Sequence, residues 1–170
     1  MTTIGTHRVR RARPEEHEAV GLVTFRGFGH DVPGARQPAR ARRVLLLDAA
    51  ARAADGDLLV AVDAADRPVG TVTLLPPGAT LSRQSRSREA EIRLLAVVPE
   101  ARRSGIARAL MTAAIDRART WDVDALVLDT GPQNTASQAL YLQLGFERQP
   151  DRETQPASSG GLLAVFRLAL

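Results

Sequence analysis

Runs of apolar residues along the chain, some continuous and some alternating with polar residues, predict β-strands separated by helices. The strands are expected at residues 7–13, 58–62, 69–75, 90–98, 125–128 and 162–168. A short turn containing Asp, Pro and Gly joins the second run to the third, which is typical of a hairpin. The stretches at 27–38 and 76–88 are polar or rich in Gly and Pro, and we expect loops there.

Apolar residues at helical spacing predict helices between these strands. They are expected from Pro14 onward and at residues 40–54, 105–120 and 136–144. Pro14 is followed by Glu15, Glu16 and Glu18, a typical helix start because acidic residues there lie near the positive end of the helix dipole. The pattern therefore predicts an α/β (α+β) protein with a sheet of six to seven strands and about four helices, in a single domain over residues 1–170.

Composition narrows the possible functions. The 170 residues include no cysteine, which excludes disulfides, thiolate metal sites and a cysteine nucleophile. The three histidines are too far apart to match a metal-binding spacing, so we expect no metal. The chain shows no apolar stretch of signal-peptide or membrane-spanning length, so we expect a cytoplasmic protein without a membrane partner.

The charged residues argue against nucleic acid as the main partner. All 23 basic residues are arginine, yet the formal net charge is only +4 and aromatic residues make up only 4%. Nucleic-acid-binding surfaces usually combine clustered basic residues with aromatic residues that stack on bases. Abundant arginine and alanine without lysine suggests a GC-rich genome, and we expect a bacterial source.

Residues 99–110, PEARRSGIARAL, link the strand expected at 90–98 to the following helix. The first N–H groups of a helix lack intrahelical partners and favour an anion, while a glycine before them allows a phosphate to approach the backbone closely. Arg102 and Arg103 add charge that suits a diphosphate. The stretch is neither a P-loop nor a dinucleotide fingerprint, and by itself it also fits an ordinary helix start with solvated arginines.

A wider match favours the anion site. The segment LAVVPEARRSGIARALM resembles the coenzyme A pyrophosphate loop of the Gcn5-related N-acetyltransferase (GNAT) family, Arg/Gln-x-x-Gly-x-Gly/Ala, with Arg102, Gly105 and Ala107 at the defining positions. NTASQALYLQLGFE resembles the second signature of the family, an Asn followed seven residues later by a Tyr and then by Gly-Phe. The resemblance covers residues 90–147 and implies a mixed, mostly antiparallel sheet with two splayed central strands. It departs from the family where Arg103 replaces a frequent Gly and where Ala107 replaces the commoner final Gly.

The resemblance implies that acetyl-CoA, as co-substrate, lies between the strands that end near Val97 and Asp129. Backbone groups of Leu95, Ala96 and Val97 would then bond its acetyl and pantetheine amides. Asn134 would bond the pantetheine arm, cap the helix that follows it, or do both. The pyrophosphate would lie beside Arg102 on the N–H groups of Arg103, Ser104, Gly105, Ile106, Ala107 and Arg108.

For the chemistry, the resemblance points to Tyr141, and the position along the strand points to Glu91. Tyr141, the only tyrosine, corresponds to the general acid that protonates the departing thiolate, although an aromatic residue packed on the sheet is the alternative. Glu91 would take the proton of the acceptor ammonium, since strict alternation along the strand places it on the same face as Leu95 and Val97. Glu89 or water could be the base instead. Either glutamate could also simply pair with arginines.

These features lead us to expect an acyl-CoA dependent N-acyltransferase. It would transfer acetyl to a primary amine of a small molecule, an amino acid or a peptide N-terminus by direct attack in a ternary complex. Arginines in the loop at 27–38, the helix at 40–54 and the loop at 80–88 suggest an acceptor that is acidic or bears a carboxylate. The alternatives are a toxin-like enzyme that acetylates aminoacyl-tRNA and a module that senses coenzyme A or binds a partner without catalysis. The final strand either pairs in a homodimer or closes the sheet of a monomer.

Overall fold

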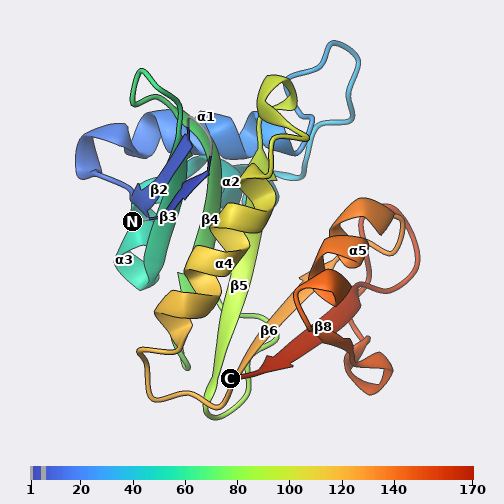
Figure 1. Ribbon diagram of the computed structural model, residues 1–170. Coiled ribbons are helices and arrows are strands. Elements are labelled where there is room, and N and C mark those ends of the chain that lie inside the picture. Colours follow the sequence, from blue (N-terminus) through green and yellow to red (C-terminus); the bar gives the residue numbers. More distant parts are fainter. Residues whose placement is uncertain (1, 5–6) are drawn as a thin grey trace.

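A single mixed sheet organises the protein (Figure 1). The computed structural model describes residues 2–4 and 7–170. Within them the strands lie in the order β1-β2-β3-β4-β5-β6-β8-β7, and every neighbouring pair is antiparallel except β5 and β6. The strands are β1 Thr2–Ile4, β2 His7–Arg11, β3 Asp57–Val62, β4 Pro68–Leu75, β5 Glu89–Val97, β6 Ala125–Thr130, β7 Glu147–Arg148 and β8 Ala164–Ala169.

Five α-helices and three short 3-10 turns connect these strands. The helices are α1 His17–Gly27, α2 Arg40–Leu47, α3 Ala49–Asp55, α4 Ile106–Ala118 and α5 Thr135–Gln143. The 3-10 turns are η1 Pro14–Glu16, η2 Pro99–Ala101 and η3 Pro150–Arg152. None of the helices in this described part combines the length and hydropathy needed to cross a membrane.

The predicted fold class and mixed, mostly antiparallel sheet are confirmed, with two differences in the element count. The sheet has eight strands because β1 and the two-residue β7 join it. The single helix expected at residues 40–54 is two helices, because Asp48 leaves the helical conformation (φ −81°, ψ 75°). Its side chain accepts a hydrogen bond from the N–H of Ala51, so Asp48 ends α2 and caps α3.

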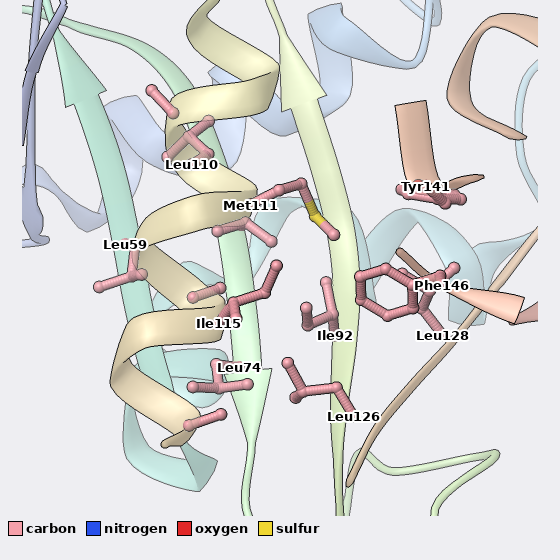
Figure 2. Close-up of a cluster of buried hydrophobic side chains, with 14 of the residues drawn as sticks. Leu59, Leu74, Ile92, Leu110, Met111, Ile115, Leu126, Leu128, Tyr141 and Phe146 are labelled. Carbon is pink, nitrogen blue, oxygen red and sulfur yellow. The ribbon is translucent and has the colours of Figure 1, made fainter. Parts of the chain in front are cut away.

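Helices cover both faces of the sheet, which explains why its strands read as continuous apolar runs (Figure 1). In β3, Leu59 faces the side of α4, whereas Leu58 and Val60 lie in a separate cluster with α1 and α3. Figure 2 shows Met111 of α4 beside Ile92 of β5. The apolar stripe of α4 is therefore held on the sheet, and this fixes the position of its N-terminal end.

The two central strands separate, as predicted for β5 and β6 (Figure 1). They pair in parallel only from Glu89↔Ala125 to Ile92↔Leu128. Beyond this point β5 continues along β4, and β6 continues along β8. Strand β8 lies between β6 and β7, so the final strand closes the sheet within the chain.

A β-bulge in β5 changes which side chains share a face. Thr73 pairs with Arg93 but Thr71 pairs with Ala96, so two residues of β5 oppose one of β4, and Leu94 has a positive φ of 57°. Leu94 consequently packs beside α1 and α2, while Leu95 and Val97 pack on the α4 side. The expectation that Glu91 shares a face with Leu95 and Val97 is therefore wrong, because strict alternation fails at the bulge.

Candidate active site

The turn between β5 and α4 has the conformation of an anion-binding loop. After η2, Arg103 (φ 59°) and Gly105 (φ 81°, ψ 0°) both adopt left-handed backbone conformations, and α4 begins at Ile106. Glycine enters this region without a steric cost, whereas arginine rarely does. The two left-handed residues turn the backbone sharply at the start of the helix.

The N–H groups of six consecutive residues lack an acceptor within residues 2–4 and 7–170. They belong to Arg103, Ser104, Gly105, Ile106, Ala107 and Arg108. The first bonded N–H is that of Ala109, which donates to the carbonyl of Gly105 at 3.0 Å. Free donors at the positive end of a 13-residue helix favour a phosphate group.

A pocket of about 270 Å³ adjoins these donors. Its lining comes from the end of β5, the turn, the start of α4, and Leu140 of α5. The residues are Val97, Ala101, Arg102, Arg103, Gly105, Ile106, Ala107, Arg108 and Leu140. The structure thus brings most of the predicted cofactor residues into one pocket. Ser104 lies in the turn between Arg103 and Gly105, and Leu95 and Ala96 lie on β5 directly before Val97.

The arginines of the turn have different surroundings. The guanidinium of Arg102 donates to the carbonyl of Gly27 at 2.9 Å and to that of Val97 at 3.2 Å, which ties the end of α1 to the turn. Arg108 donates to Gln143 and so links α4 to α5. Arg103 is exposed and lacks a side-chain hydrogen bond among the described residues. Arg103 is therefore the turn arginine whose charge is available to a ligand.

Asn134 lies at the start of α5, beyond the end of β6. Its side chain accepts a hydrogen bond from the N–H of Ser137 at 3.3 Å and donates to the hydroxyl of Thr130 at 3.3 Å. The helix-cap interpretation of Asn134 is confirmed. Its contact with a cofactor stays a prediction.

Tyr141 of α5 is buried at 5% exposure between the aromatic rings of Phe146 and Phe166. In the view of Figure 2 it lies above Phe146, with β5 between it and α4, and it belongs to the same core cluster as the α4 side chains. The pKa of the Tyr141 phenol is raised to about 12, mainly because the group is buried. The charge of Asp129 also raises this pKa, whereas the Ser137 hydroxyl lowers it. The phenol therefore keeps its proton at neutral pH and can donate it.

Glu91 is 1% exposed and organises the loop between β4 and β5. Its Oε2 accepts hydrogen bonds from the hydroxyl of Ser82 (2.6 Å) and from the N–H groups of Arg83, Gln84 and Ser85 (2.7, 2.7 and 3.1 Å). Its Oε1 has no hydrogen-bond partner in the described chain and lies 3.7 Å from Nε of Arg93. One oxygen of this carboxylate holds the loop, and the other is buried beside Arg93 without a hydrogen-bond partner.

Glu89, the alternative base, is fully engaged in a buried ionic cluster. Its two oxygens accept hydrogen bonds from Arg152, Arg167 and the N–H of Arg86 at 2.9–3.1 Å. Burial raises the pKa of the Glu89 carboxyl, but the hydrogen bonds from Arg152 and Arg167 outweigh it, and the pKa is lowered. A carboxylate held in this way is a poor proton acceptor.

Asp129, directly beyond the last β5–β6 pair, has hydrogen-bond partners from a distant loop. Its carboxylate accepts hydrogen bonds from Arg83 Nε and Gln84 Nε2, both at 2.9 Å. The β4–β5 loop folds back over β6 here, and no local signal in the sequence links positions that lie 45 or 46 residues apart.

Comparisons with known proteins agree with this geometry. The sequence profile described as the Acetyltransferase (GNAT) family matches residues 30–146. A comparison with curated proteins gives no significant match.

Solved structures with low sequence identity share the fold. A protein from Corynebacterium glutamicum, described as histone acetyltransferase HPA2 and related acetyltransferase, is 22% identical with a TM-score of 0.71, and the match covers 98% of each chain. The protein yncA from Salmonella typhimurium, determined with its cofactor acetyl-CoA, is 20% identical with a TM-score of 0.69 over 98% of this chain and 95% of that one. The ribosomal-protein-S18-alanine N-acetyltransferase of Escherichia coli is 19% identical with a TM-score of 0.68 over 96% of this chain and 93% of that one.

The matched profile spans well over half of the chain and includes both the turn before α4 and the Asn134 to Phe146 segment. The protein therefore belongs to the GNAT family of acetyltransferases.

Proposed function

We propose that this protein transfers the acetyl group of acetyl-CoA to a primary amine by direct attack of the amine. The observation that carries this proposal is the row of six free N–H groups at the start of α4, beside the pocket that reaches Leu140 of α5. Family membership supports the same conclusion, since the profile match includes this turn.

The residues of the pocket fit a coenzyme A diphosphate. The free N–H groups and the helix dipole would hold the pyrophosphate, and the exposed Arg103 would add charge. Beyond Ile92, the edge of β5 that faces β6 has no strand partner in the described chain. The backbone of Leu95, Ala96 and Val97 would therefore hold the pantetheine amides as an added strand does. When bound, acetyl-CoA supplies the activated thioester carbonyl.

Tyr141 would be the general acid, because its phenol stays protonated at neutral pH. It would hold its proton where the coenzyme A sulfur departs. Glu91 would be the general base, because Oε1 has no hydrogen-bond partner while Oε2 keeps the carboxylate in place. The chain contains no cysteine for a thioester-linked acyl-enzyme, which favours direct attack by the amine.

The acceptor belongs to one of a few amine classes. The E. coli structural neighbour is named for an alanine of a ribosomal protein, so a peptide N-terminus is one candidate class for this chain. Free amino acids and other small amines form the second. Aminoacyl-tRNA acetylation and coenzyme A sensing without transfer are the alternatives that the experiment must separate.

The first experiment incubates the purified protein with acetyl-CoA and a panel of amines while release of free thiol is recorded. The panel contains amino acids, peptides with free N-termini, polyamines, aminoglycosides and charged tRNA, and parallel samples without an amine give the background hydrolysis. We expect release above background with one class. If no amine of the panel gives thiol release above background although calorimetry shows that acetyl-CoA binds, the result would contradict the proposal and favour the sensing module.

A further inference from the structure

Three arginines gather where β5 and β6 separate, on the face of the sheet opposite α4. The last β5–β6 pair is Ile92↔Leu128, so Arg93 and Asp129 are the first residues beyond it. Arg83 reaches this point from the β4–β5 loop and bonds Asp129. Arg42 reaches it from α2, which lies with α1 behind the sheet in Figure 1.

The helical spacing of α2 aims Arg42 toward this site. Leu46, one helical turn after Arg42, packs with Leu94 of β5 and Phe25 of α1. Residues four apart on a helix share a face, so Arg42 faces the same strand as Leu46. Arg93 directly precedes Leu94 on that strand, and the bulge keeps both on this face.

Arg42 differs from the other two arginines because its guanidinium has no hydrogen-bond or carboxylate partner among the described residues. Arg83 is paired with Asp129, and Arg93 donates to the carbonyl of Leu81. Arg42 is half-buried with its Cζ 5.0 Å from the centre of the Phe28 ring. Burial and the positive charges of Arg93 and Arg83 lower the pKa of the Arg42 guanidinium, so an anion placed here would relieve the repulsion.

We propose that Arg42, with Arg93 beside it, binds a carboxylate carried by the acceptor amine, so that the preferred acceptors are amines of the amino-acid class. This inference rests on the proposed function, because it assigns the acceptor of that same site.

The local charge favours a carboxylate over a phosphate. Two carboxylates, Glu91 and Asp129, lie among the three arginines, which leaves a formal charge of +1 in the cluster. A singly charged anion neutralises this cluster, whereas a dianionic phosphate would face two nearby carboxylates.

The geometry also separates the two substrates. The free N–H groups of the turn belong to α4, which packs on one face of the sheet. Arg42 comes from α2, whose Leu46 packs on the other face. An acceptor anchored by Arg42 would therefore reach the opening between β5 and β6 from the side opposite the coenzyme.

The test compares alanine, methionine, phenylalanine and glutamate with their α-amides, which lack the α-carboxylate. Transfer is measured as thiol release with acetyl-CoA, and binding is measured separately by calorimetry with coenzyme A in its place, so that no reaction occurs. We expect the wild-type protein to have Kd and KM values about 10- to 100-fold lower for an acid than for its amide, as for hydrogen bonds to a charged group. Arg42→Met should collapse this ratio to near one.

Arg43→Met is the matched control. Arg43 is the next residue of α2, and its Cζ also lies over an aromatic ring, 4.9 Å from the centre of Phe25. We expect Arg43→Met to keep the preference for acids, and Arg42→Lys to restore part of what Arg42→Met loses. Thermal unfolding of each variant shows whether it is folded.

The outcomes separate the two proposals. Transfer without a preference for acids, or a preference that Arg43→Met removes as fully as Arg42→Met does, overturns the carboxylate site and leaves the acetyltransferase intact. A calorimetric preference that depends on Arg42 without transfer to any amine supports the carboxylate site and contradicts the proposed function.

Discussion

At the residue scale, the two side chains proposed to move protons have opposite surroundings. Tyr141 is enclosed by Phe146 and Phe166, which disfavours its ionised form. Glu91 is equally buried but accepts four hydrogen bonds at one oxygen. The first environment keeps a proton on an acid, and the second holds a carboxylate in position.

Tyr141→Phe tests the acid. Because the substitution removes only the hydroxyl, we expect kcat to fall about 100- to 10,000-fold while the Kd for acetyl-CoA changes little. The raised pKa of about 12 also predicts that the wild-type kcat does not decline between about pH 8 and pH 10 through loss of the phenol proton. Steady-state kinetics across this range and calorimetry with acetyl-CoA check both statements. Full activity of the variant would remove Tyr141 from the mechanism.

Glu91→Gln separates the two roles of Glu91. Glutamine keeps an acceptor oxygen for the loop but cannot take a proton, so we expect kcat to fall about 100-fold while the amides of Arg83 to Ser85 stay protected from hydrogen exchange. Glu91→Ala should lose both the activity and the protection. A fully active Glu91→Gln protein would assign Glu91 to the loop alone and leave water as the base.

At the scale of elements, the site depends on how closely α1, α2 and β5 approach one another. Gly21 of α1 lies against the last turn of α2, where an added Cβ would come within 3.0 Å of Leu47 backbone atoms. Gly27, at the end of α1, similarly meets Ala96 of β5. These close contacts hold α2, and with it Arg42, against the strand that forms the site.

Gly21→Ala is therefore expected to destabilise the protein although alanine favours helix. The gain in helix propensity is about 1 kcal/mol, but forcing a methyl group into backbone atoms costs about 1–3 kcal/mol or more and displaces α2. Urea unfolding measures the free energy of unfolding, with Gly131→Ala as control, because the nearest heavy atom to an added Cβ there is 3.9 Å away. A more stable Gly21→Ala protein would show that α1 and α2 can separate at no cost.

At the scale of the whole molecule, two parts of the sheet meet along a short border. β5 and β6 pair over only four residues, so the part formed by β6, β8 and α5 carries Tyr141 on a narrow connection (Figure 1). The Glu89 cluster reinforces this border, because Glu89 belongs to β5 whereas Arg152 and Arg167 belong to η3 and β8. A buried charge of this kind stabilises only while its partners are present.

Glu89→Gln should lower the free energy of unfolding at pH 7 by about 3–5 kcal/mol, because it leaves buried arginine without its carboxylate. The pKa of Glu89 is lowered from its ordinary value of 4.5, so its contribution is complete above 4.5 and is lost as the pH falls through the folded value. The difference between wild type and variant should therefore shrink under acidic conditions. Urea unfolding at several pH values checks this, and a difference independent of pH would contradict it.

Features that depend on neighbouring residues can be predicted from the amino-acid sequence alone. Helical and strand periodicity, the capping chemistry of Asn134 and the turn before α4 are local features, since their hydrogen bonds join residues a few positions apart. The turn could be recognised because the left-handed Gly105 and the free N–H groups that follow it belong to one short segment of the sequence. The family signatures lie in the same kind of local segment.

Features that depend on contacts between distant residues arise only when the chain is folded. The bulge at Leu94 moved Leu95 and Val97 to the face opposite Glu91, because its register is set by pairing with β4. The partners of Asp129 and the approach of Arg42 to Arg93 come from segments that are far apart in sequence. Packing of α2 and of the β4–β5 loop on the sheet brings these charges together. The periodic pattern of a single segment cannot predict contacts between separate segments.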